Sequence, residues 1–123
     1  MRTLLAVGVG GFIGALARFA IHEGMARLVG TALPLGTLIV NVAGSFALGI
    51  LVGLAELTDV SPTVRLGVGV GVLGAFTTFS TFSIDTLSVA ARSGMALATL
   101  NVVANVTLAI AAAAGGLFVA RGW

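Results

Sequence analysis

The densest cluster of polar side chains lies in the middle of a long apolar stretch, in the segment 74–83 (GAFTTFSTFS). Five hydroxyl residues stand within seven positions there, and a phenylalanine recurs at every third position. One Ser or Thr in a membrane helix can bond back to its own backbone, but five together are hard to explain in that way. Hydroxyl groups donate hydrogen bonds and aromatic ring edges carry partial positive charge, so this segment has the chemistry to face a small anion. The alternative is that the phenylalanines only pack against neighbouring side chains and contact no ion.

Amide side chains interrupt two other apolar stretches. Asn41 stands alone in the segment 36–46 (GTLIVNVAGSF), whereas Asn101 and Asn105 are four residues apart and share one helix face. Each amide offers two N–H donors and one acceptor oxygen. The alternative is that these amides only join helices, an interaction worth about 0.6 kcal/mol in a membrane.

The ionisable residues near these stretches are few. Arg18 and Asp85 each lie near the end of an apolar stretch, and no acid or histidine lies in the middle of one. A proton-coupled carrier normally needs an intramembrane carboxylate or histidine, and a cation exporter needs a negative site. Neutral donors, ring edges and one arginine suit instead a small anion that must lose its water. A small multidrug-resistance type exporter would need a glutamate in the first stretch, where positions 3–17 contain no acid.

The composition places these groups in a membrane. Of 123 residues, 59% are hydrophobic and only 8% are charged, which is too few charges to cover a soluble surface. A soluble enzyme and a nucleic-acid-binding protein are therefore excluded, and we expect no enzymatic activity. The charges divide the chain into four apolar runs, and a membrane helix needs about 20 such residues. We expect one integral membrane domain over 1–123, with all-α architecture and helices over approximately 3–21, 33–56, 64–90 and 95–120.

Glycine is unusually frequent, with 18 residues, and should shape these helices. GxxxG pairs, which let helix backbones approach closely, occur in three runs, at 10 and 14, 49 and 53, and 67 and 71. The glycines upstream of the hydroxyl cluster predict that the third helix is broken. The GxGxxG pattern at 69–74 lacks the strand and βαβ context of a dinucleotide site. A cleavable signal peptide remains an alternative for the first run.

The arginines give almost no preference for one orientation in the membrane. Three lie on the side of the N-terminus, and two or three lie on the other side, depending on Arg18. Such a chain can insert both ways and pair as an antiparallel dimer. The alternative is that one orientation is slightly preferred for reasons other than the arginine distribution.

Three segments in order, 10–18 (GGFIGALAR), 36–46 and 74–83, strongly resemble the motifs of the CrcB/Fluc family of fluoride channels. The resemblance covers essentially the whole chain. It implies a dual-topology antiparallel dimer of four-helix subunits in a bacterial or archaeal cell membrane. Two pores per dimer would export cytoplasmic fluoride passively. The expected partner is a second copy of the chain, although some family members pair as heterodimers; a purely structural membrane subunit is the remaining alternative.

The resemblance also assigns roles to residues. It implies a structural sodium ion at the dimer centre, held by the backbone carbonyls of Gly74 and Thr77. Arg18 matches an arginine near the vestibule. In helix four the family usually has a tyrosine followed by a serine or threonine, and this chain has asparagines at both places. The expected pore residues are Asn41, Phe79, Ser80, Thr81, Phe82, Asn101 and Asn105.

Overall fold

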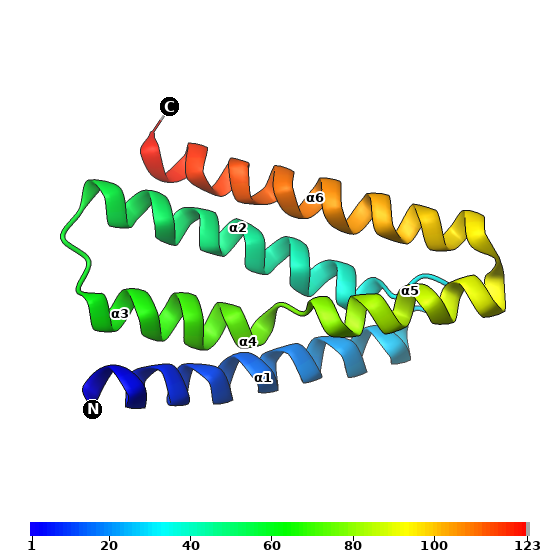
Figure 1. Ribbon diagram of the computed structural model, residues 1–123, viewed down its shortest axis with the longest axis horizontal. Coiled ribbons are helices and arrows are strands. Elements are labelled where there is room, and N and C mark those ends of the chain that lie inside the picture. The colour runs from blue at the N-terminus through cyan, green and yellow to red at the C-terminus, as the bar shows by residue number, and fades with distance from the viewer. Residues whose placement is uncertain (123) are drawn as a thin grey trace.

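The computed structural model describes residues 1–122 and is built from four helical spans (Figure 1). Each span is long and apolar enough to cross a membrane, so the prediction of an all-α, multi-pass membrane protein is confirmed. The start of the first span and the end of the fourth span lie at the same end of the bundle (Figure 1). The elements are α1 (Arg2–Leu28), α2 (Leu35–Leu57), α3 (Pro62–Leu66), η1 (Gly67–Leu73), α4 (Gly74–Phe76), α5 (Phe79–Ser93) and α6 (Met95–Arg121).

The third span is composite. The short helix α3 begins at the N-cap Ser61, whose hydroxyl accepts a hydrogen bond from the Val64 N–H at 3.3 Å. It continues into η1, a glycine-rich π-helix, and then into α4. The chain unwinds at Thr77 and Thr78, and α5 begins directly afterwards. The glycine-rich segment therefore remains helical, and the break lies downstream of it.

The first span is longer than its apolar run. Helix α1 continues to Leu28, seven residues past the expected end at position 21. Glu23 and Arg27 lie one turn apart on this extension and form an exposed ion pair at 3.4 Å. The end of an apolar run marks the edge of the hydrocarbon region, whereas the helix itself can continue into the polar interface.

Glycines bring the helix backbones into contact in two pairs of spans. A Cβ atom on Gly10 or Gly14 of α1 would overlap a backbone carbonyl oxygen of η1, that of Gly67 or Val72 respectively. In the second pair, Gly49 of α2 meets the backbone of α6 in the same way. The bundle therefore consists of α1 against the first half of the third span and of α2 against α6 (Figure 1).

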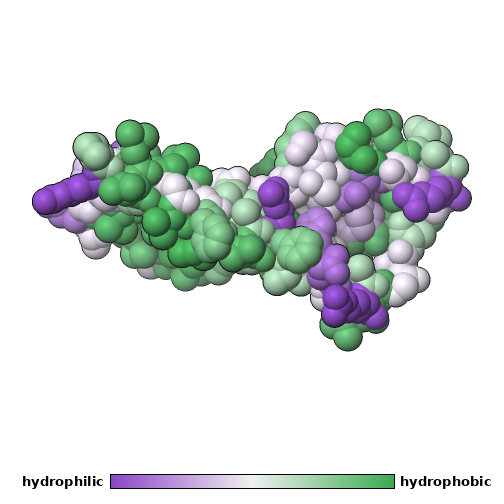
Figure 2. Space-filling view, turned by 90° about the horizontal axis from the view of Figure 1, so that it is seen from below, coloured by the Kyte–Doolittle hydropathy of each residue, from purple (hydrophilic) through white to green (hydrophobic). Residues whose placement is uncertain are grey.

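The outer surface is largely apolar, and the interior is small. Figure 2 shows hydrophobic residues over most of the face it presents, with much of the hydrophilic surface toward the two ends. The buried apolar side chains are few because lipid can solvate the others. They are Val40, Leu73, Phe82, Val89 and Ala98.

Candidate functional site

The break in the third span is held open by an amide from α2. Thr78 has an extended backbone (φ −152°, ψ 120°), so its peptide groups lack helical partners. Asn41 replaces these partners: its Oδ1 accepts from the Thr78 N–H at 2.8 Å, and its Nδ2 donates to the Thr78 carbonyl oxygen at 3.2 Å. Unwound backbone at membrane depth needs such partners, since lipid supplies none.

The three asparagines are brought together and bonded to one another. Asn41 Nδ2 donates to Asn105 Oδ1 at 3.1 Å, and Asn105 Nδ2 donates to Asn101 Oδ1 at 3.1 Å. Asn101 Nδ2 then donates to the Thr86 hydroxyl of α5 at 2.8 Å. Asn101 and Asn105 are both buried. The amides therefore connect α2, α5 and α6 with hydrogen bonds inside the bundle.

The hydroxyl groups after the break form a smaller cluster. Thr78 caps α5, because its Oγ1 accepts from the Thr81 N–H at 3.3 Å and also donates to Thr81 Oγ1 at 3.0 Å. The Thr81 hydroxyl keeps its own hydrogen free to donate. Ser80 is exposed and lies 3.4 Å from Thr78 Oγ1, so the expected hydroxyl residues do lie together at the start of α5.

The two expected pore phenylalanines are neighbours with different environments. Their ring centroids are 5.5 Å apart and the rings are tilted by 52°. Phe82 is 8% exposed, whereas Phe79 is 77% exposed on the outside of the bundle. Both rings line a groove of about 360 Å³ between α2, the break and α6. Among residues 1–122, no ionisable side chain lines this groove, which also includes Asn41, Ser45, Thr77, Thr78 and Asn105.

Backbone oxygen atoms at the break could hold a cation. Within residues 1–122, no hydrogen bond reaches the carbonyl oxygens of Gly74 and Thr77. These oxygens lie where the first half of the span ends, and the C-terminal end of a helix is its negative end. Free carbonyls at a half-helix end are the ligands with which broken membrane helices coordinate Na⁺. The position therefore fits the sodium ion that the resemblance implies.

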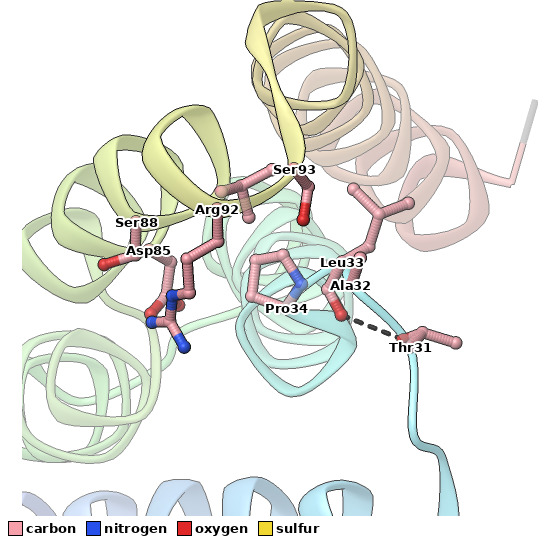
Figure 3. A pocket seen from close by; sticks show the side chains of 9 residues that line it. Thr31, Ala32, Leu33, Pro34, Asp85, Ser88, Arg92 and Ser93 are labelled. Atoms are coloured by element: carbon pink, nitrogen blue, oxygen red, sulfur yellow. Dashed lines mark hydrogen bonds between the residues drawn. The ribbon is translucent and has the colours of Figure 1, made fainter.

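A second polar region lies at the end of the bundle where α1 ends. The Thr37 hydroxyl, which is 1% exposed, donates to the Asp85 carboxylate at 2.5 Å. Asp85 also lines a cavity of about 220 Å³ between α5 and the loop before α2, and Figure 3 shows it with Arg92, which lines the same cavity from α5. Arg18 is half-buried on α1 and does not line this cavity.

Two threonines that the sequence did not single out pair with Asp85 and with the expected pore residue Asn101. Thr37 binds Asp85, and Thr86 binds Asn101. Thr37 stands four residues before Asn41, which puts both on one face of α2. Thr86 likewise stands four residues after Phe82, so helical spacing was the signal that could have identified both.

Comparison with known proteins agrees with the motifs. Residues 5–117 match the family described as "CrcB-like protein, Camphor Resistance (CrcB)". A protein of Shewanella woodyi named "Fluoride-specific ion channel FluC" is 46% identical over 110 residues, which is 89% of each chain. A protein of Shewanella baltica with the same name is 44% identical over the same share of each chain. The protein described here therefore belongs to the CrcB family.

Proposed function

We propose that this protein is a fluoride-selective channel that lets the ion leave the cytoplasm passively. The observation that carries this proposal is the groove at the break, where hydroxyls, amides and two aromatic rings meet without an ionisable group. The relatives named as fluoride-specific channels support the same ion. A small multidrug exporter receives no support, because the first span contains no acid between positions 3 and 17.

The groove would select fluoride by replacing its water with protein donors. Fluoride is small and strongly hydrated, so several donors must approach it closely. Beside the groove, Thr81 and Asn101 each retain a hydrogen that is free to donate, whereas the Ser80 hydroxyl donates to Thr78 Oγ1 at 3.4 Å. Within the groove, the edges of Phe79 and Phe82 carry partial positive charge. Several weak neutral sites allow the ion both to enter and to leave.

Asn41 and Asn105 contribute differently in this proposal. Both N–H groups of each amide are already engaged, those of Asn41 with Thr78 and Asn105 and those of Asn105 with Asn101. These two side chains would hold the break open and fix its donors. Either amide could donate to the ion only if one of its N–H groups first left its present acceptor in the protein.

The groove also supports an antiparallel homodimer. It lies on the outside of the subunit, where Phe79 is 77% exposed and polar side chains would otherwise meet lipid. Polar groups at membrane depth need protein or water partners. A second copy in the inverted orientation would cover the groove on each subunit and produce two pores. The nearly equal arginine counts at the two ends permit both orientations.

A sodium ion at the dimer centre is the remaining part of the proposal. The free carbonyl oxygens of Gly74 and Thr77 would hold it, and the corresponding oxygens of the second copy would complete its coordination. Its charge would make the local potential more favourable for an anion without contacting that anion.

The proposal is tested with purified protein in liposomes loaded with fluoride. We expect efflux that persists without a proton gradient, because no titratable group lies in the groove. Liposomes loaded with chloride should retain it. Equal passage of chloride would contradict the selectivity, and fluoride retention by liposomes that contain the protein would contradict the channel itself.

Exchange of either phenylalanine tests the ring edges. We expect Phe79→Ile and Phe82→Ile each to reduce fluoride efflux at least about tenfold, which corresponds to about 1.4 kcal/mol, because isoleucine has no positive ring edge. Phe79→Ile is the sharper variant, since Phe79 is 77% exposed and packs little within its own subunit. Phe12→Ile on the exposed surface of α1 is the control. Normal efflux in both variants would show that the rings only pack.

A further inference from the structure

Thr86 stands at the end of a chain of hydrogen bonds that begins at the break. The Thr78 N–H donates to Asn41, Asn41 to Asn105, Asn105 to Asn101, and Asn101 to Thr86. Thr86 in turn donates to the carbonyl oxygen of Phe82 at 2.8 Å. Every donor in this chain points in the same direction, from the break toward α5.

The two ends of the chain impose this direction. At the first end, the Thr78 backbone presents both its N–H and its carbonyl oxygen to Asn41, so Asn41 must place its oxygen at the N–H and its nitrogen at the carbonyl. At the other end, the single hydrogen of the Thr86 hydroxyl goes to Phe82, so Thr86 must accept from Asn101. An amide that is reversed between these ends would place oxygen against oxygen and N–H against N–H. The direction is therefore fixed for all three asparagines.

This direction decides which amide hydrogen remains free. Both N–H groups of Asn41 and of Asn105 are engaged, whereas Asn101 Nδ2 donates only to Thr86. Asn101 is 3% exposed, so its second N–H is a buried donor that has no acceptor in the described part of the chain, residues 1–122. A buried donor without an acceptor is unfavourable, and an anion would satisfy it.

We propose that Thr86 is a positioning residue for ion transport. By accepting from Asn101, its hydroxyl keeps the amide nitrogen of Asn101 toward α5 and leaves the second N–H, next to the groove residue Asn105, for the anion to satisfy. Without this acceptor, the side-chain amide of Asn101 can exchange the positions of its oxygen and nitrogen. The chain of hydrogen bonds then loses its defined direction. The role in transport rests on the proposed fluoride channel, whereas the orientation of the amides does not.

Thr86→Val, which keeps the shape and removes the hydroxyl, tests this role. Loss of a neutral hydrogen bond corresponds to roughly a two- to tenfold change, so we expect fluoride efflux to fall by that factor. Thr86→Ser should restore it, since serine keeps the hydroxyl. Thr107→Val is the matched control, because the Thr107 hydroxyl bonds only to its own helix and is exposed. Normal efflux in Thr86→Val, or no recovery in Thr86→Ser, would overturn the proposal.

A double variant shows whether Thr86 acts through Asn101. We expect Asn101→Ala with Thr86→Val to transport no more slowly than Asn101→Ala alone, because both changes break the same link. Additive losses would overturn the proposed route.

A measurement without fluoride separates this inference from the channel proposal. In ¹⁵N-labelled protein, Thr86→Val should shift the side-chain amide signals of Asn105 and Asn41, two and three links away. Thr107→Val should leave them unchanged. Unshifted signals would overturn the fixed direction even if the protein conducts fluoride. If the wild-type protein carries no fluoride but the signals shift, the channel proposal and the transport role of Thr86 fail, and the orientation of the amides stands.

Discussion

Replacing Asn41 with aspartate should abolish fluoride efflux and destabilise the break in the third span. A carboxylate has no N–H, so the variant would set its oxygen atoms against two others, the Thr78 carbonyl at 3.2 Å and Asn105 Oδ1 at 3.1 Å. It would also place a negative charge beside the proposed path of an anion. A charged side chain at the centre of a membrane helix costs about 2.5–3.5 kcal/mol on insertion scales.

Asn41→Ala separates the charge from the lost contacts. Alanine leaves the Thr78 N–H without an acceptor, which costs about 1–3 kcal/mol for a buried group, but it introduces no repulsion. We therefore expect efflux at neutral pH to fall in the order wild type, Asn41→Ala, Asn41→Asp. Thr107→Ala, which removes an exposed polar side chain outside the groove, is the control. Faster efflux through the aspartate variant than through the alanine variant would contradict the assigned contacts.

Adding a single methyl group at Gly14 should prevent α1 from docking. A Cβ atom there would overlap the Val72 carbonyl oxygen and would lie 3.1 Å from the Phe76 backbone nitrogen. Backbone atoms cannot rotate away as the end of a side chain can, so the helices would have to separate. Inserting extra carbon into a well-packed contact typically costs about 1–3 kcal/mol. We expect Gly14→Ala to lower the yield of folded protein and its midpoint of thermal unfolding.

Gly11→Ala is the matched control on the same helix. A Cβ atom on Gly11 meets nothing within 4 Å, so the same change of residue type should leave folding intact or improve it slightly. Size-exclusion chromatography and thermal unfolding in detergent give the comparison. Equal stability of the two variants would contradict the close approach of α1 to the third span.

Much of the architecture could be predicted because a membrane imposes simple requirements. Apolar length alone located four spans, and the glycines of the third span predicted that it breaks, although the break lies downstream of them at Thr77 and Thr78. The end of α1 could not be predicted in the same way, since the helix continues through polar residues beyond the apolar run. The glycine spacing identified helices that approach closely, but it carried no information about which carbonyl each glycine meets. That pairing depends on the tertiary arrangement.

The polar site was predicted in its composition but not in its connections. Asn41, Asn101 and Asn105 are evident in the sequence as amides in apolar runs. Their bonding partners come from α2, α5, α6 and the break, and no spacing within one helix encodes such contacts. Helical spacing puts Thr86 on the face of Phe82, but Thr86 was overlooked because a threonine in a helix is most simply explained by its bond to its own backbone. Its second partner became evident only from the packing of α5 against α6.

The glycine contacts between helices have a consequence for how a solute can cross this bundle. Where backbone touches backbone, as at Gly14 with Val72, the seam is too tight to admit even one water molecule. One subunit therefore has no path through this helix contact, and its polar groove lies on its outer surface. In the proposed dimer, a path between the subunits would be lined by their outer surfaces, so its width would depend on how the two chains pack against each other.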